Sequence, residues 1–500
     1  MRIFPYGMAA ILCAATAALW PAPAQAQEAP AAKSLRREID PVVVSGDPVK
    51  PLWGRKISSL RLQVRRDGAW AAIPFQIDKV DGDGDYFIAT STIPQEIRDE
   101  TGFEDVPEEK KRARRIKKFE GERKKLERQV EEGKLTQAEL DDRRRNAYFE
   151  EDLEKLDYND EVVFMGRDAG DQASWDTWPS PDGVELEITD PLDGGRAWAY
   201  LFFFASSPPP LSKDDYITYH PERDFIVTRL SEIDFNDENP MLVESIVGKP
   251  PGSPVIPNVL DRFKMRIRIR PIGLFCASLN FDENNARAFT IGYKDGPVRL
   301  LRRNIFWIVI AGVRLPFAPK IVMYFKFYEN GLAASSDLYV PFNPKYFVCE
   351  GSRFTAGLDF RKNTYGARVF TKDNKDLVID GKMSPAEIDR VKPNQDWIAG
   401  YLPSRAALMS RMIYDPEMVR HGAKMDFHFL DDGELEDKPE HEPGQHVIGY
   451  TIDVKNFPKG KYYVGFSIYT AYDFEPEQVQ ELLNVDDNPL KVTGRPGGSN

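Results

Sequence analysis

Three aspartates at alternate positions form the sharpest chemical cluster in this sequence. They are Asp81, Asp83 and Asp85, with glycines between them. Alternate carboxylates in a glycine-loosened loop can direct several hard oxygen atoms at one centre, as Ca²⁺ requires. The spacing matches the first three ligand positions of an EF-hand, but Tyr86 and Thr92 replace the glycine and the glutamate of that motif. We therefore predict a simpler aspartate-rich calcium loop, with an ordinary polar β-turn as the alternative.

A second candidate site follows the strand-like run Glu161–Met165. Arg167 and Asp168 come directly after it, and Trp175 and Trp178 stand a few residues further on. Aromatic faces beside charged groups line many sugar-binding clefts, because sugar C–H faces stack on rings while the hydroxyls take polar partners. We predict a ligand site from these four side chains. The alternative is that they only fasten the loop.

The cysteines and histidines give weaker indications. Cys276 and Cys349 each follow an apolar, strand-like stretch, and the two permit one disulfide pairing. Two buried thiols that never meet are the alternative. The five histidines form no metalloprotease motif, and the sequence has no nucleophile elbow, P-loop or dinucleotide-binding motif. Hydrolysis by paired carboxylates is compatible with this pattern, because folding rather than local spacing sets such pairs.

The start of the chain has the order of a secretory signal peptide. Arg2 supplies a positive charge, an apolar run reaches Trp20, and Ala24-Gln25-Ala26 provides small residues for cleavage. We predict a signal peptide over residues 1–26 and a periplasmic or secreted protein. No later apolar run reaches the length of a membrane span. The net charge of −12 argues against nucleic acid as the main partner.

The elements that must position these residues are mainly strands. Leu60, Leu62 and Val64 alternate with polar residues, and Asp67-Gly68 then marks the turn of a hairpin. Many further apolar runs of period two are separated by Pro, Gly, Asn and Asp rather than by regular helices. This pattern predicts a mainly β fold of antiparallel β-sandwich units. Ser384-Pro385-Ala386-Glu387 marks a short helix start, and Pro403 to Arg420 has loosely helical spacing.

A charged segment interrupts the strands. Residues 107–156 are rich in Lys and Arg, lack strand patterns, and predict two helices joined near Gly133. We read this segment either as a solvated helical hairpin inserted in the β body or as a basic arm for an anionic partner. The predicted organisation is a signal peptide over 1–26, a first β unit over 27–106, the hairpin over 107–156, a sandwich continuation over 157–345, a C-terminal β-rich unit over 346–488 and a disordered tail over 489–500.

One short run resembles a known fold family. Asp295-Gly296-Pro297-Val298-Arg299-Leu300-Leu301-Arg302 is similar to a strand of the large β-sandwich domains of carbohydrate-active proteins, the galactose-mutarotase-like supersandwich. The resemblance covers about eight residues, and no catalytic residue is carried over from it.

Three functions fit this sequence. The leading hypothesis is an exported binding or envelope-associated protein, with a glycan or another envelope component as its partner. The second is a polysaccharide-acting lyase or hydrolase on a β-sandwich scaffold. The third is a subunit of an extracellular assembly that docks through the basic hairpin. A cleft at the Trp175/Trp178 loop with two carboxylates would favour the enzyme, and dispersed acidic groups would favour the binding protein.

Overall fold

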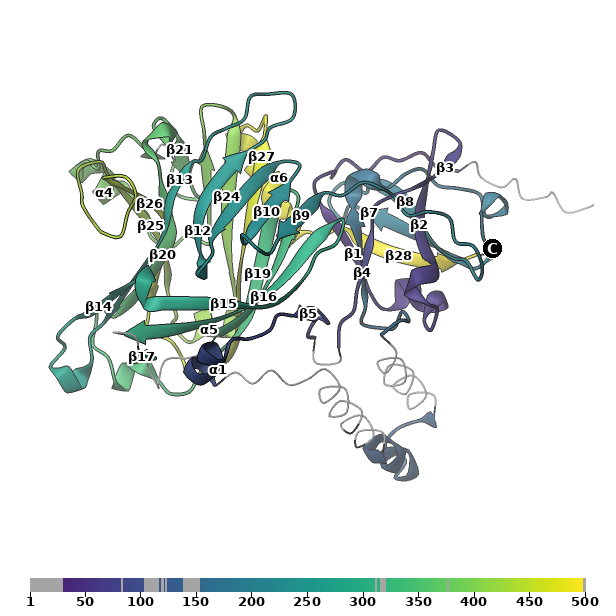
Figure 1. The fold of residues 1–500 in the computed structure, drawn as a ribbon, viewed down its shortest axis with the longest axis horizontal. Helices are drawn as coiled ribbons and strands as arrows, with labels where there is room; N and C mark the ends of the chain where they lie inside the picture. The colour runs from purple at the N-terminus through teal and green to yellow at the C-terminus, as the bar shows by residue number, and fades with distance from the viewer. Residues whose placement is uncertain are drawn as a thin grey trace, which may run out of the picture.

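The computed structural model describes residues 30–497 except 82–83, 103–116, 118–120, 122–123, 138–152, 311–312, 315–320 and 376. The predicted signal peptide therefore lies outside the described residues. The fold is mainly antiparallel β, as the sequence predicts, and its strands form five sheets in two bodies (Figure 1). Among the described helices, none combines the length and the apolar character that crossing a bilayer requires.

The first body is a small sandwich of residues 30–81, 153–204 and 491–497. Its three-stranded sheet, in the order β1-β6-β4, packs against a five-stranded sheet in the order β28-β7-β8-β2-β3. Val42 and Phe164 of the smaller sheet share one core with Leu62 and Leu201 of the larger sheet. The strands are β1 (Pro41–Val44), β2 (Leu60–Arg66), β3 (Ala69–Ala72), β4 (Gln76–Asp78), β6 (Glu161–Met165), β7 (Gly183–Thr189), β8 (Arg196–Phe203) and β28 (Lys491–Pro496).

The second body is built around an eleven-stranded sheet. Its order is β22-β21-β23-β24-β27-β19-β18-β16-β15-β5, with β17 beside β16. The strands are β5 (Ala89–Thr90), β15 (Ala286–Lys294), β16 (Arg299–Ile310), β17 (Val313–Arg314), β18 (Ile321–Tyr328), β19 (Gly331–Val340), β21 (Arg368–Phe370), β22 (Leu377–Val378), β23 (Trp397–Tyr401), β24 (Ala406–Tyr414) and β27 (Gly460–Tyr472).

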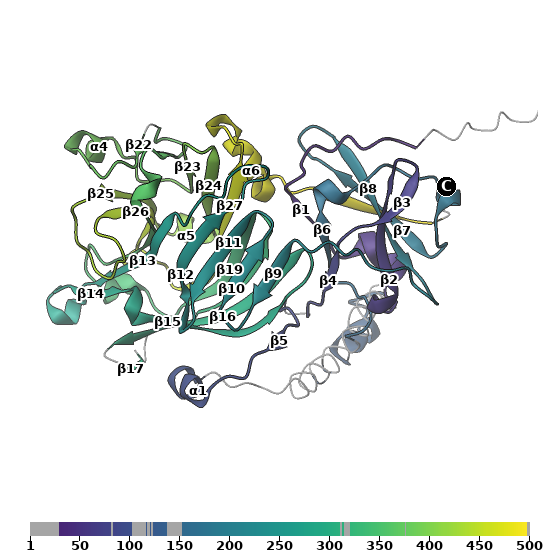
Figure 2. The ribbon, with the colours of Figure 1, turned by 45° about the horizontal axis from the view of Figure 1, so that its top comes forward.

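Two smaller sheets cover this long sheet. A five-stranded sheet packs its Phe427 and Tyr450 against Val369 and Ile398 of the long sheet. A four-stranded sheet lies against another part, where Ile226 meets the core residues of β16 and β18 (Figure 2). The strands of the five-stranded sheet are, in sheet order, β14 (Leu279–Asp282), β13 (Leu260–Ile269), β20 (Arg353–Phe360), β26 (Gln445–Asp453) and β25 (Met425–Asp432). The strands of the four-stranded sheet are, in sheet order, β12 (Asn239–Gly248), β11 (Ser231–Asn236), β10 (Phe225–Thr228) and β9 (Ile217–His220).

Short helices complete the second body. α6 (Val479–Asp487) packs Leu482 and Leu483 onto Met409 of the long sheet. Three further short α-helices are α1 (Gln95–Thr101), α4 (Pro385–Arg390) and α5 (Pro416–Arg420). The predicted start of α4 is confirmed, because Ser384 and Glu387 form a capping box.

A buried ionic cluster joins the two bodies. Arg299, which is fully buried, donates from Nε to Asp78 of β4 at 2.7 Å and pairs with Glu161 of β6. Its Nη1 also donates to Tyr328 at 3.1 Å. Burial lowers the pKa of Arg299, but Tyr328 and the two carboxylates outweigh that effect and raise it well above its ordinary value. Arg299, which belongs to the run that resembles a strand of carbohydrate-active proteins, is therefore a structural residue that connects the two bodies.

The structure corrects several predicted elements. Half of the segment from Pro403 to Arg420 is strand β24, which pairs with β23 and β27, and only α5 is helical there. The predicted disordered tail contains β28, which pairs with β7 from Lys491 to Pro496. The chain passes from the first body to the second after β4 and after β8, and β28 returns to the first body, while the eleven-stranded sheet takes strands from both sides of the predicted boundary at 345. Most of the predicted hairpin lies outside the described residues, although residues 124–131 are helical and Gly133 follows with a φ of 66°.

Candidate functional site

An open groove of about 470 Å³ lies beside the junction of the two bodies. The start of β9, the end of β10 and the chain after β12 form its walls. Two cations, Arg229 and Lys249, and one carboxylate, Asp215, belong to the lining. The remaining lining residues are Tyr216, Ile217, Thr218, Val227, Thr228, Leu230 and Pro251.

Tyr216 forms a fixed base beneath the groove. Its side chain is nearly buried, and its hydroxyl donates to both carboxylate oxygens of Asp168 at 3.0 Å. Burial raises the pKa of Tyr216 to about 12, and the charge of Asp168 adds to this effect. Burial likewise raises the pKa of Asp168, although the Tyr216 hydroxyl and Arg167 oppose the increase. At neutral pH the phenol is therefore protonated and holds Asp168 in place.

Two arginines and one glutamate surround the same ring. Glu329 is almost wholly buried and pairs with Arg167 of the first body and with Nε of Arg229 at 3.1 Å. Both guanidinium groups lie over the Tyr216 ring, at 4.3 Å for Arg167 and 5.2 Å for Arg229. A cation over an aromatic face is attracted by the ring quadrupole. Burial lowers the pKa of Arg167, but Glu329 outweighs that effect and the pKa is raised.

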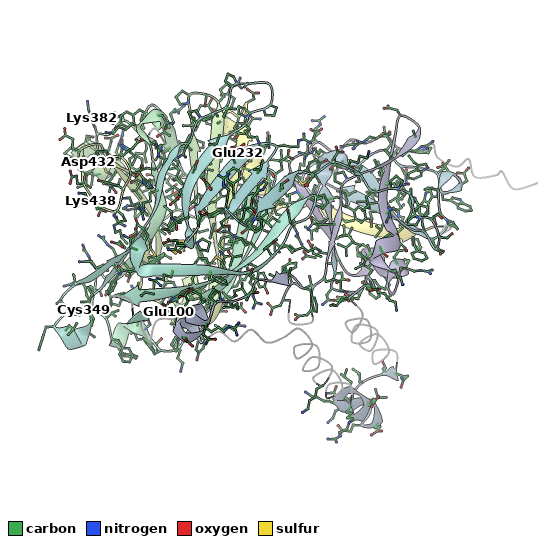
Figure 3. The ribbon with its side chains drawn as sticks, in the orientation of Figure 1. Glu100, Glu232, Cys349, Lys382, Asp432 and Lys438 are labelled. Carbon is green, nitrogen blue, oxygen red and sulfur yellow. A yellow bond between two sulfur atoms is a disulfide. The ribbon has the colours of Figure 1, made fainter. Side chains whose placement is uncertain are left out.

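The groove lining carries two cations beside the exposed carboxylate of Asp215. The Arg229 side chain is 58% exposed, so its guanidinium reaches solvent although one edge faces Glu329. Lys249 is held by its backbone N–H, which donates to the carbonyl of Leu230 at 2.8 Å. Its ammonium lies 3.5 Å from Glu232, a residue labelled in Figure 3. The arrangement presents two positioned cations along an open groove, which suits a ligand with negative groups.

The four predicted ligand residues separate into two places. Arg167 and Asp168 support the groove through Glu329 and Tyr216. Trp178 instead packs edge-to-face on Tyr200 and on Phe202, and its ring centroid lies 5.4 Å and 5.3 Å from theirs. Trp175 is 51% exposed in a short 3-10 turn. Trp178 therefore belongs to an aromatic cluster of the first body, and neither tryptophan lines the groove.

The calcium prediction remains untested by the structure, because Asp83 lies outside the described residues. Asp81 is buried, and its carboxylate accepts a hydrogen bond from the Asp85 backbone N–H at 2.9 Å. Asp85 accepts one from the Tyr324 hydroxyl at 3.0 Å. Within the described part of the chain, no group of at least three His, Cys, Asp or Glu side chains is arranged to hold a metal ion.

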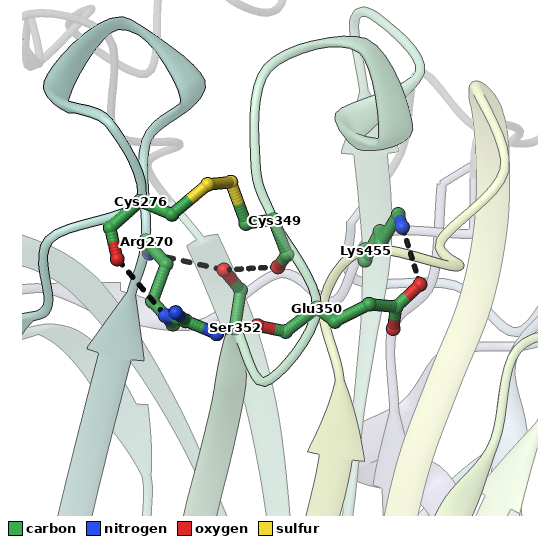
Figure 4. The surroundings of a disulfide bond; sticks show 6 residues. All are labelled: Arg270, Cys276, Cys349, Glu350, Ser352 and Lys455. Atoms are coloured by element: carbon green, nitrogen blue, oxygen red, sulfur yellow. Dashed lines mark hydrogen bonds and ion pairs between the residues drawn. A yellow bond between two sulfur atoms is a disulfide. The ribbon is translucent and has the colours of Figure 1, made fainter.

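Cys276 and Cys349 are joined by a disulfide (Figure 4). Their Cα atoms lie 5.8 Å apart, although 73 positions separate them in the sequence. The bond ties the turn after β13 to the segment before β20.

Sequence reasoning did not identify the central residues of the groove. Tyr216, Arg229 and Lys249 stand in runs of ordinary strand and turn composition. Glu329 occupies the turn between β18 and β19, where Glu329-Asn330-Gly331 reads as a polar hairpin turn. Nothing local indicates its burial, which arises because the four-stranded sheet and the first body close over this turn.

Comparisons with known proteins give only distant likenesses. No family model and no curated protein matches the sequence. An alpha-N-acetylgalactosaminidase NagBb from Bifidobacterium bifidum aligns over 52% of this chain and 38% of its own, with 9% identity and a TM-score of 0.31. An alpha-mannosidase from Enterococcus faecalis aligns over 63% and 39%, with 10% identity and a TM-score of 0.34.

A third solved structure, a protein in the glycosyl hydrolase family 38 from Enterococcus faecalis, aligns over 93% of this chain and 46% of its own. Its identity is 8% and its TM-score is 0.38. In all three alignments this chain spans less than half of the other protein. At TM-scores this low, we transfer neither a fold name nor an activity to this chain.

Proposed function

We propose that this chain is an exported β-sandwich protein that binds a glycan with acidic groups in the groove formed by β9 and β10. The observation that carries the proposal is the pair of cations in the groove lining, the exposed Arg229 and the half-buried Lys249, beside the fixed base of Tyr216, Glu329 and Arg167. Charge-assisted hydrogen bonds to carboxylate, phosphate or sulfate groups are stronger than neutral ones.

The shape of the groove supports a polymer over a small ligand. Small-molecule sites usually enclose most of the ligand surface. This groove is open along one side, so an extended chain can pass through it without being enclosed. The exposed Thr218 and the carboxylate of Asp215 provide polar partners for sugar hydroxyls beside the cations.

The state of the nearby carboxylates supports binding over hydrolysis. Glycoside hydrolysis by the common mechanism needs one carboxylic acid and one carboxylate that both face the scissile bond. Glu329 is buried and held by two arginines, and Asp168 is held by the Tyr216 hydroxyl. Neither group is free to approach a ligand in the groove, which leaves Asp215 as the single exposed carboxylate of its lining. The docking arm of the assembly hypothesis lies largely outside the described residues.

The test is a binding titration of the full mature protein with two soluble polysaccharides, a uronic-acid polymer and a neutral polymer of the corresponding sugar. We expect binding to the acidic polymer alone, and Arg229→Gln should weaken it about tenfold through loss of one charge-assisted contact of about 1.4 kcal/mol. Arg196→Gln is the matched control, because the Arg196 side chain is also 58% exposed and also pairs with a glutamate.

Two outcomes would contradict the proposal: equal affinity for the acidic and neutral polymers, or an equal effect of the two arginine variants. A reducing-end assay on the same mixtures separates binding from cleavage. Release of new reducing ends that depends on the protein would support the enzyme hypothesis instead.

A further inference from the structure

Two loops at one end of the second body form a projecting apolar tip. We define the apolar tip as Ile272, Leu274 and Phe275 of the turn after β13, together with Phe342, Tyr346 and Phe347 of the segment before β20. All six are exposed, and the Phe275 side chain is the extreme case, at 98%. Figure 3 labels Cys349 at this end of the molecule, far from the first body. Such clustering is unusual, because exposed apolar residues normally occur singly.

The tip is rigidly built. The disulfide between Cys276 and Cys349 ties its two loops together, and the Ile272 N–H donates to the Phe347 carbonyl at 2.9 Å. Phe342 and Phe347 pack edge-to-face, with ring centroids 4.8 Å apart. The guanidinium of Arg270 donates from Nε to the Cys276 carbonyl at 3.0 Å beneath the turn (Figure 4). These bonds hold the apolar side chains outward rather than letting them fold back.

The backbone of the turn after β13 adopts a conformation that is unfavourable for residues other than glycine. Phe275 has a φ of 52° and Cys276 a φ of 61°, both in the left-handed region. Non-glycine residues persist there only when the surrounding structure imposes the conformation. The disulfide and the Arg270 contact therefore maintain an arrangement that places Phe275 almost fully in solvent, against both its backbone preference and its hydrophobicity.

The surroundings of the tip are positively charged. Arg268, Arg270 and Lys345 lie within or directly beside the two loops, and none of them forms an ion pair with a carboxylate in the described part of the chain. Glu350 is the nearby acid, and Lys455 neutralises it. This local charge contrasts with the net charge of −12 for the whole chain.

We propose that the apolar tip inserts into the surface of a membrane that contains anionic phospholipid. Aromatic and aliphatic side chains enter the boundary between headgroups and acyl chains, while Arg268, Arg270 and Lys345 lie at the headgroups. A bilayer accepts a convex apolar projection without a complementary surface. A specific protein interface takes about 20 to 30 residues from each partner, far more than this tip offers. This function is separate from ligand binding in the groove, which lies beside the first body.

The test is flotation of the full mature, oxidised protein with phosphatidylcholine vesicles, with and without phosphatidylglycerol. We expect the protein to float with the anionic vesicles. The double variant Leu274→Ser and Phe275→Ser should lower the partition coefficient at least about tenfold, because burial of one such side chain contributes more than a tenfold change. Leu211→Ser with Val255→Ser is the matched control, since Leu211 and Val255 are 55% and 61% exposed away from the tip.

The dependence of vesicle binding on salt and on the basic residues beside the tip provides an independent test. Raising the salt from about 0.1 M to about 1 M shortens the Debye length from about 10 Å to about 3 Å, and should release most of the protein from anionic vesicles. Arg268→Gln with Lys345→Gln should weaken binding to anionic vesicles several-fold. All substituted side chains are at the surface, and matching melting curves would establish that each variant is folded.

Three results would overturn the proposal. The first is no flotation of the wild-type protein with either vesicle. The second is an equal loss in the tip variant and in the control variant. The third is a dimer in solution that the tip variant dissociates, because the tip would then be an interface between two copies of this chain.

Discussion

Arg167 of the first body and Glu329 of the second form an ion pair across 162 positions of sequence. Arg167 follows the buried strand β6, and Glu329 lies in the turn between β18 and β19. Both contact the elements around Tyr216, so the ion pair connects the junction of the bodies to the base of the groove. The groove therefore depends on how the two bodies meet.

Glu329→Gln should lower the free energy of unfolding by about 2 kcal/mol. The substitution removes the carboxylate that separates Arg167 from Arg229, and leaves the partly buried Arg167 without its partner. Urea unfolding followed by two probes measures the change and tests whether both bodies unfold together. Glu350→Gln is the control, because Glu350 is 75% exposed in its ion pair and its loss should cost at most about 0.5 kcal/mol. Equal stability of wild type and Glu329→Gln would show that the pair contributes nothing.

His428 should make the protein lose stability as the pH falls. Burial lowers the pKa of His428 to about 4, and the charge of Arg353 adds to the effect. The pKa of an unfolded histidine is about 6.5, so the folded state favours the neutral ring. The contribution of His428 to the free energy of unfolding is fully present above about pH 6.5. It is lost between about pH 6.5 and about pH 4, by roughly 2 to 3 kcal/mol.

The measurement is the melting temperature of His428→Gln relative to wild type across this pH window. The difference between the two proteins should change with pH, because only the wild type takes up a proton at position 428 on unfolding. A difference between His428→Gln and wild type that stays constant across this pH window would refute the predicted titration.

Reduction of the disulfide between Cys276 and Cys349 should destabilise the oxidised protein by about 2 to 4 kcal/mol. The bond closes a long loop, with a sequence separation of 73, and restricts the unfolded chain. Melting with and without a phosphine reductant measures the effect, and thiol titration checks that reduction is complete. The double variant Cys276→Ala with Cys349→Ala should melt identically in both conditions. An equal melting temperature of the wild-type protein with and without the reductant would contradict the expectation.

Calcium at Asp81, Asp83 and Asp85 is still a prediction from the sequence. Three carboxylates at alternate positions repel one another, and a divalent cation between them relieves that repulsion. A cation at about a hundredfold excess over its Kd would stabilise the folded state by about 2.7 kcal/mol. We expect calcium to raise the melting temperature, chelator to lower it, and Asp83→Asn to remove most of the response. Superimposable melting curves in calcium and chelator would identify the loop as an ordinary turn.

The sequence by itself determined the local elements. The alternation of Leu60, Leu62 and Val64 and the turn at Asp67-Gly68 predict the hairpin that β2 and β3 form. Both turn residues have positive φ, as tight hairpin turns require. The capping box of Ser384 and Glu387 likewise sets the start of α4. These features follow from the sequence because a few adjacent residues fix the backbone through sterics and local hydrogen bonds.

Only the tertiary structure decided which distant segments meet. The spacing of residues 403–420 fits a helix, yet pairing with β23 and β27 makes half of that segment a strand. The terminal Lys491–Pro496 becomes ordered because β7 offers it a free edge. Glu329 stands in a polar turn but is buried because Arg167 and Arg229 neutralise it there. Strand partners and buried ion pairs depend on contacts between residues far apart in the chain, and local propensity carries no information about those contacts.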